Sequence, residues 1–338
     1  MSSETFTLAQ VRALSGEALR ACGASPEAAD AVADAVAAAE RDGVASHGLA
    51  YVPTYCEHLL CGKVNPAAKV AIAVEGSVVR ADADSGFAHP AINQAFEKLV
   101  PLARTHGIAA AAIRNSYNCG VLGYHTERLA QQNLVGLGFT NAPASIAPHG
   151  ARKAMFGTNP WSAAAPDGKG GAAFVIDQSA SVVAKSEVMK RQREGQAVPL
   201  GWVLDANGQP TTDPAEGLKG TMVPAGGPKG VGSALLVELM AVCLAGATPG
   251  FSAAPFSGKE GGPPRTGQFF IAIDPQATSG GLFADRLSAI CETMTQIEGA
   301  RLPGSRRFAS RAVAERDGVA VNPAVVERIR AVMKQGVA

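Results

Sequence analysis

Asp42-Gly43-Val44-Ala45-Ser46-His47-Gly48 stands just beyond an Ala- and Val-rich stretch that runs from Pro26 to Glu40. That stretch opens with Ser25-Pro26-Glu27, where a serine N-cap, a proline at the first helical position and an early glutamate are typical of a helix start. Its apolar residues occupy more than one face, which predicts a well-buried helix ending at Asp42-Gly43. The heptapeptide therefore places a serine and a histidine at the end of a buried helix.

A histidine at this position can act as a proton donor. Its usual pKa of about 6.5 lets the imidazole give up and regain a proton near neutral pH. The hydroxyl of Ser46 beside it, together with a carboxylate, can set its tautomer. The alternative is that Ser46 only caps the next helix and that His47 is an ordinary polar residue. The residues by themselves leave both interpretations open.

Outward from this motif, apolar strands alternate with helices, which favours an α/β or α+β fold. No internal repeat is visible, and none of the Gly/Pro-rich stretches resembles a flexible linker. The pattern predicts strands within Val70–Ala83 and over Ile108–Arg114, Leu134–Thr140, Phe174–Asp177 and Gln268–Asp274. It predicts further helices over Tyr55–Leu60, Pro90–His106, Tyr124–Asn133, Ser181–Glu194, Val231–Ala245, Ala284–Ile297 and Pro323–Lys334.

The glycine fingerprint of a Rossmann fold is missing from the sequence. A G-x-G-x-x-G string would be expected after an early strand, but the nearest match, Gly230-Val231-Gly232, lacks the third glycine. A P-loop, an H-E-x-x-H helix and a G-x-S-x-G elbow are also not found. Motif chemistry alone leaves the function open.

The composition bounds the class of protein. The chain has 338 residues, of which 47% are hydrophobic and 17% are charged, which is typical of a globular protein. A net charge of +1 argues against a nucleic-acid partner. The N-terminus lacks the apolar core of a signal peptide, and no apolar run approaches the ~20 residues of a membrane span. The six cysteines form no C-x-x-C pair, so we expect free thiols, no metal site and a cytoplasmic location.

Two polar loops in the first half of the chain are candidate ligand sites. Asn115 to Gly120 follows a predicted strand and precedes a helix, so its backbone N–H groups can hold a phosphate or nucleotide. Pro148 to Pro160 contains Arg152 and Thr158, which can bind a carboxylate or phosphate. The alternatives are a capping loop without a ligand and an irregular connection with solvated charges.

Two turns in the second half suit an anion as well. Gly226 to Gly230 places Lys229 at the start of a predicted helix, and Leu302 to Arg307 is a turn with two arginines. A capping turn and a solvated basic turn are the alternatives. Each signal is weak, but together they suit a dinucleotide and a small anionic substrate.

The motifs in their order resemble the malate/L-lactate dehydrogenase family that lacks the Rossmann fold. The resemblance covers nearly the whole chain, and the stretches around Arg152 and Arg306 are most similar to the Δ1-piperideine-2-carboxylate and Δ1-pyrroline-2-carboxylate reductases of that family. The matching motifs are D-G-V-x-S-H-G (Asp42 to Gly48), G-T-N-P (Gly157 to Pro160), T-T-D-P (Thr211 to Pro214), G-x-K-G (Gly227 to Gly230) and L-P-G-x-R-R (Leu302 to Arg307).

The resemblance implies a non-Rossmann NAD(P)-binding fold of the α/β (α+β) class, with a mixed sheet and a helical domain built from both termini. Residues 1–70 and 285–338 would form the helical domain, 71–120 and 160–284 the central cofactor-binding domain, and 121–159 a smaller substrate region. It also implies a homodimer with the active site near the subunit interface.

For the site, the resemblance implies that His47 donates a proton to the substrate, that Ser46 polarises His47, and that Glu187 completes the relay. Thr158, Tyr51 and Arg152 would contact the substrate. NADP, or NAD in its place, would be held by Asn118, Cys119, Gly120, Val121, Leu122, Ile176, Asp177, Gln178, Lys229, Gly230, Arg301, Pro303, Gly304, Arg306 and Arg307.

Three positions depart from the family pattern. Tyr51 stands where the family usually has an arginine that grips the substrate carboxylate, and Asn118 and Pro228 stand where histidines are frequent. Either Arg152 or Lys153 takes over the carboxylate, or the substrate is larger or less acidic and Tyr51 donates a hydrogen bond to it.

The expected function is NAD(P)H-dependent reduction of a small 2-imino (cyclic ketimine) or 2-oxo carboxylate by hydride transfer to C2. One alternative is a 2-hydroxy acid dehydrogenase that acts on malate, lactate or sulfolactate. Another is a catalytically silent family member that binds a nucleotide.

Overall fold

A seven-stranded mixed sheet forms the centre of the computed structural model, which describes residues 4–336. β3 and β4 run parallel, and the other neighbouring strands run antiparallel. The strands lie in the order β2 (Ala71–Glu75), β3 (Val78–Asp82), β4 (Ile108–Ser116), β11 (Thr266–Ile273), β5 (Val135–Thr140), β6 (Trp161–Pro166) and β7 (Ala172–Gln178). This pairing differs from the parallel βαβ units of a Rossmann fold, so the expected mixed, non-Rossmann sheet is confirmed.

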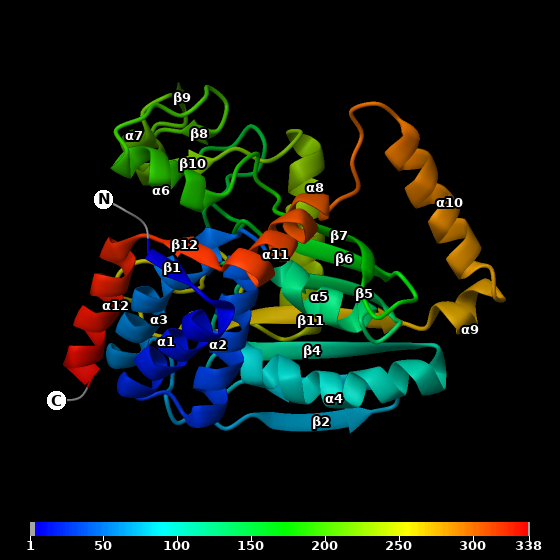
Figure 1. Cartoon of the computed structure of the whole chain (residues 1–338). Helices are drawn as coiled ribbons and strands as arrows, with labels where there is room; N and C mark the ends of the chain where they lie inside the picture. The colour runs from blue at the N-terminus through cyan, green and yellow to red at the C-terminus, as the bar shows by residue number, and fades with distance from the viewer. Residues whose placement is uncertain (1–3, 337–338) are drawn as a thin grey trace.

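Helices cover both faces of this sheet (Figure 1). α4 (Ala88–His106) and α5 (Leu122–Ala130) pack on one face, and α8 (Pro228–Glu238) with its π-helical continuation η3 (Leu239–Leu244) packs on the other. The neighbouring residues Phe269 and Phe270 of β11 belong to the two different cores, because successive side chains of a strand point to opposite faces.

The chain termini meet in a helical layer beside the sheet. α1 (Leu8–Ala21), α2 (Pro26–Arg41), α3 (Val52–Leu60) and α12 (Pro323–Gly336) share one apolar core. β1 (Glu4–Phe6) pairs with β12 (Val319–Val321), which ties the first described residues to the last helix. Figure 1 shows these elements together on one side of the molecule. The expected helical part built from both termini is thereby confirmed.

Two further parts flank the sheet. A small lobe contains α6 (Lys185–Arg193), α7 (Pro214–Lys219) and the short strands β8 (Val203–Leu204), β9 (Pro210–Thr211) and β10 (Thr221–Met222). On the other side, α9 (Pro275–Ser279) leads into α10 (Phe283–Gln296), which has no buried residue and lies away from α12 (Figure 1). The division into domains at residues 70, 120, 159 and 284 stays a prediction.

Most predicted elements are present, with corrections at their ends. The Ser25 hydroxyl caps α2 by accepting from the Ala28 N–H, as expected. The helix predicted from Ser181 begins at Lys185, and Leu302–Arg307, predicted as a turn, runs into α11 (Ser305–Asp317). α11 buries only Ala314, so it has no apolar period by which the sequence could reveal it. Among the described helices, none combines the length and apolarity that crossing a membrane requires.

Candidate active site

The Ser46-His47 motif lies on two short 3₁₀ turns that join α2 to α3. These turns are η1 (Ala45–His47) and η2 (Leu49–Tyr51). The Ser46 Oγ lies 2.9 Å from the His47 Nδ1, so the hydroxyl is placed to fix the tautomer of the imidazole. With Nδ1 engaged in this way, Nε2 is the ring nitrogen that remains for a ligand.

The surroundings of His47 favour its neutral form. His47 is half-buried, and this burial lowers the pKa of its imidazole. The charge of Asp177 acts in the opposite direction and the charge of Arg307 lowers the pKa further. Because Asp177 and Arg307 form an ion pair at 2.9 Å, their effects on His47 oppose each other and burial prevails.

Beside His47, Tyr51 and Asn118 form a pair of uncharged polar side chains. The rings of His47 and Tyr51 are stacked with centroids 6.3 Å apart. The Asn118 amide donates to the Tyr51 hydroxyl at 3.4 Å, and its oxygen accepts from the Tyr55 hydroxyl at 3.2 Å and from the Gly120 N–H at 3.1 Å. Two of the three positions that depart from the family pattern, Tyr51 and Asn118, are therefore hydrogen-bonded to each other next to His47.

Three predicted cofactor segments converge on Asp177. Its carboxylate accepts from the Gly123 N–H at 3.0 Å, at the start of α5 and next to the Asn118–Leu122 loop, and pairs with Arg307. The first N–H groups of a helix lack partners within the helix, and Asp177 supplies one. The turn that carries Arg307 also lies against β7, since the Pro303 carbonyl accepts from the Val175 N–H at 3.2 Å. Ile176 and Gln178 flank Asp177 on the same strand.

Gly304 and Gly120 allow the backbone to pass close to its neighbours. Gly304 has a φ of +88°, and a side chain there would press on the Val175 backbone. Gly120 has a φ of +68° and packs against the His89 ring. Cys119 and Leu122 are buried, while Val121 is half-buried between them. The predicted cofactor loop, Asn118 to Leu122, is thus held in place by its buried side chains Cys119 and Leu122.

Thr158 and Gly230 lie next to Ala180, just beyond the end of β7. The Thr158 carbonyl accepts from the Ala180 N–H at 2.8 Å, and the buried Gly230 packs against the Ala180 carbonyl. Lys229 lies exposed in the first turn of α8. The exposed Arg301 and Arg306 flank the turn at Gly304.

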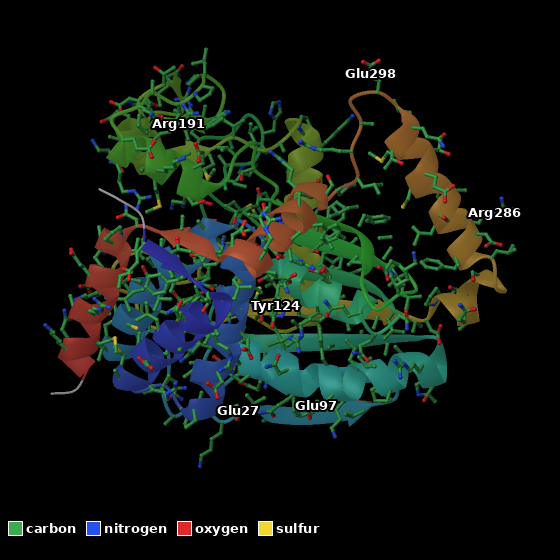
Figure 2. The ribbon with its side chains drawn as sticks, in the orientation of Figure 1. Glu27, Glu97, Tyr124, Arg191, Arg286 and Glu298 are labelled. Atoms are coloured by element: carbon green, nitrogen blue, oxygen red, sulfur yellow. The ribbon has the colours of Figure 1, made fainter. Side chains whose placement is uncertain are left out.

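Two predicted residues have other contacts. Within residues 4–336, the Glu187 carboxylate is paired with Arg191 at 3.3 Å, on the small lobe where Figure 2 labels Arg191. Arg152 is exposed and lies against Gly208 of the same lobe. Their roles in the relay and at the substrate carboxylate stay predictions. Across those described residues, no cluster of three or more His, Cys, Asp or Glu side chains is arranged to hold a metal ion.

Sequence reasoning missed the charge cluster that connects these segments. The Arg311 guanidinium, on α11, binds Asp42 with two hydrogen bonds of 3.0 and 2.9 Å and binds Glu127 with two of 2.7 and 3.0 Å. Asp42 belongs to the motif that precedes His47, and Glu127 lies on α5. Because the partners are far apart along the chain, no local pattern signals this cluster.

The fold and the site together define an oxidoreductase of the non-Rossmann class. A family profile described as malate/L-lactate dehydrogenase matches residues 6–330. The chain therefore belongs to the malate/L-lactate dehydrogenase family.

Individual relatives have two kinds of activity in their names. The chain is 42% identical over 330 residues to (2R)-3-sulfolactate dehydrogenase (NADP(+)) of Chromohalobacter salexigens, covering 97% of this chain and 98% of the relative. It is 41% identical over 302 residues to a Δ1-pyrroline-2-carboxylate/Δ1-piperideine-2-carboxylate reductase of Pseudomonas putida, covering 88% of each. The solved Δ1-piperideine-2-carboxylate reductase of Pseudomonas syringae superposes with a TM-score of 0.92 at 36% identity, covering 98% of this chain and 100% of that chain.

The Arg311 cluster generates a prediction about stability. Arg311→Met removes the cation that joins two nearly buried carboxylates: Glu127 loses its partner, while Asp42 keeps its ion pair of 2.8 Å with Arg41. Loss of one partner of a buried pair typically costs about 3–5 kcal/mol, and we expect about 3 kcal/mol in the free energy of unfolding, measured by urea denaturation. The matched control is Arg316→Met, whose pair with Asp317 is exposed and screened by solvent, so the free energy of unfolding should barely change. Equal free energies of unfolding in Arg311→Met and Arg316→Met would contradict the stabilising role of the Arg311 cluster.

Proposed function

We propose that this chain is an NADPH-dependent reductase of a small 2-imino carboxylate, such as a cyclic ketimine, or of a 2-oxo carboxylate. The observation that carries the proposal is the Ser46–His47 pair, which lies beside the loops that surround Asp177. NADPH, when bound, supplies the hydride that is added to C2 of the substrate. His47 donates the proton that the substrate nitrogen or oxygen requires.

In this proposal, the chain's own residues orient the two reactants. Ser46 holds Nδ1 of His47 and directs Nε2 toward the heteroatom bonded to C2. The Tyr51 hydroxyl and the Asn118 amide are neutral hydrogen-bonding groups at the position where the family usually has cations. They suit a substrate that is held partly by uncharged contacts, with Thr158 as a further contact. Glu187 is proposed as the acidic member of the relay by resemblance, and this role requires its carboxylate to leave Arg191.

The residues around Asp177 fit a dinucleotide. The Asp177 carboxylate and Arg307 neutralise each other, while Lys229, Arg301 and Arg306 are exposed cations that can bind phosphate. We propose NADP rather than NAD because two of these arginines flank one turn and suit an additional phosphate. The name of the Chromohalobacter relative, which specifies NADP(+), supports this choice.

A 2-hydroxy acid dehydrogenase is the second candidate function, because a sulfolactate dehydrogenase is 42% identical to the chain. This second candidate corresponds to the 2-oxo substrates of the proposal, so the choice is whether the reduced bond is C=N or C=O. We therefore expect NADPH oxidation with Δ1-piperideine-2-carboxylate or Δ1-pyrroline-2-carboxylate, followed by absorbance. Activity confined to sulfopyruvate, oxaloacetate and pyruvate would instead establish the second candidate, and binding of NADPH without any turnover would indicate a silent family member.

We further propose a cytoplasmic homodimer. Four leucines of α8 and η3, namely Leu235, Leu236, Leu239 and Leu244, are between 45% and 56% exposed. Several large apolar side chains exposed on one helix and its continuation are typical of a protein–protein interface. A second copy of the chain is the partner that the family resemblance implies.

The proton-donor role predicts a large loss on substitution. His47→Ala should lower kcat by roughly 10²–10⁴-fold, because a general acid contributes by that amount. The control is His106→Ala, since His106 is exposed at the end of α4. A loss of less than a few-fold in His47→Ala, measured as NADPH oxidation, would remove His47 from the mechanism.

The lowered pKa of His47 predicts the shape of the pH profile. Reduction requires the protonated imidazole, so kcat/KM for reduction should fall as pH rises through a midpoint below the usual value of about 6.5. The oxidative direction requires the neutral imidazole and should rise through the same midpoint. An NMR titration of the His47 ring protons, assigned by their loss in His47→Ala, checks this independently of substrate. A midpoint at or above pH 7 would contradict the account.

The apolar face of α8 predicts a change in oligomeric state. The double variant Leu236→Glu/Leu239→Glu should be monomeric, because it would bury four like charges at a two-fold interface. Light scattering after size exclusion measures the mass. Leu200→Glu is the control, since Leu200 is equally apolar and 69% exposed but lies next to the small lobe. A double variant with the mass of the wild type would exclude this face as the interface.

A further inference from the structure

Glu40 lies against the two short turns η1 and η2, residues 45–51, which are called the catalytic turn here because of the role proposed for His47. It belongs to the last turn of α2, and its carboxylate oxygen accepts a hydrogen bond of 2.7 Å from the Leu49 N–H. Leu49 is the first residue of η2 and is two positions after His47. The N–H groups that open a helical turn have no partner within the turn, so Glu40 supplies the missing acceptor.

The space that Glu40 occupies explains the glycine of the Ser46-His47-Gly48 motif. A Cβ on Gly48 would overlap the carboxylate and Cγ atoms of Glu40. The φ of Gly48 is −88°, which lies outside the left-handed region, so φ does not call for glycine at this position. Gly48 is also buried, which leaves little room for the chain to move aside. Glu40 and Gly48 are therefore complementary in shape across the end of the catalytic turn.

We propose that Glu40 is a positioning residue, which fixes the backbone immediately after His47 and thereby sets the direction of the imidazole. This inference rests on the proposed role of His47 as the proton donor. The Glu40 carboxylate fills the space that a side chain on residue 48 would need, so Glu40 and Gly48 act as one unit. Displacement of a catalytic group by about 1 Å can cost on the order of 10²-fold in rate, so a contact that holds the turn has a kinetic effect.

The pKa of Glu40 agrees with a role as hydrogen-bond acceptor. Burial raises the pKa of its carboxyl, while the bond from the Leu49 N–H lowers it. A glutamine side chain carries the same acceptor oxygen without the charge. The conservative variant Glu40→Gln should therefore keep the turn in place, whereas Glu40→Ala should not.

The first experiment compares these two variants in the full-length chain. Glu40→Ala should lower kcat by roughly 10–100-fold, measured with Δ1-piperideine-2-carboxylate or with sulfopyruvate, whichever the wild type reduces. The Kd for NADPH, measured by fluorescence titration, should change by less than about twofold, because the hydrogen bond of Glu40 is to the catalytic turn and not to the cofactor segments. Glu40→Gln should stay within a few-fold of wild type. Glu17→Ala, at an exposed position of α1, is the control for the loss of an acidic side chain.

The second experiment uses the steric fit between Glu40 and Gly48. Gly48→Ala alone should impair kcat, because the new methyl group displaces the carboxylate. In the Glu40→Ala background the same change should cost little, since the overlapping atoms are gone. The two losses are therefore expected to be strongly non-additive, as for residues in contact. Circular dichroism and thermal melting identify any variant that fails to fold. If Glu40→Ala is one of them, the kcat of Glu40→Gln is compared with that of the wild type instead, and a loss of more than a few-fold overturns the positioning role.

The outcomes separate this inference from the proposed function. Wild-type kcat in folded Glu40→Ala, together with an inactive His47→Ala, would overturn the positioning role and leave the proton donor intact. Equal losses in Glu40→Gln and Glu40→Ala, or losses that multiply in the double variant, would overturn it as well. Full activity in His47→Ala would instead remove the proposed function on which the inference rests.

Discussion

The double ion pair of Arg311 is the interaction on which the placement of the site depends. One guanidinium binds Asp42, at the end of α2, and Glu127, on α5, while Arg311 itself lies on α11. All three side chains are largely shielded from solvent, and such charges are stable only when paired. The pairing therefore fixes the end of α2, which leads into the His47 turn, helix α5 after the Asn118–Leu122 loop, and helix α11 after the Gly304 turn relative to one another.

Within this frame, the charges next to His47 are paired with each other. Asp177 pairs with Arg307 and accepts from Gly123, so its charge is largely satisfied. Burial then lowers the pKa of His47, while Ser46 holds one of its ring nitrogens. Tyr51 and Asn118 bring hydrogen-bonding capacity beside the imidazole without adding a charge. The arrangement places a titratable imidazole next to uncharged hydrogen-bonding side chains.

Local signals allowed the sequence to predict the helix at Ser25 and the strands of the central sheet other than β6, because caps and apolar periods act over a few residues. The contacts of Arg311 and Glu40 could not be predicted in this way. Arg311 meets partners 269 and 184 residues away, and Glu40 acts through the backbone of Leu49. The two-residue strands β8 to β10 are too short to show an alternating pattern. The partners of Glu187 and Arg152 also depend on tertiary packing, which family resemblance does not reveal.

The central claim is that a hydride is added to C2 of a small carboxylate at the site of His47. Turnover of Δ1-piperideine-2-carboxylate with NADPH deuterated at C4 of the nicotinamide tests it most directly, with the product analysed by NMR. The account predicts one deuterium at C2 of the product from one of the two C4-labelled stereoisomers and none from the other, while the proton on nitrogen comes from solvent. A reduced product without deuterium at C2 from either stereoisomer would contradict it.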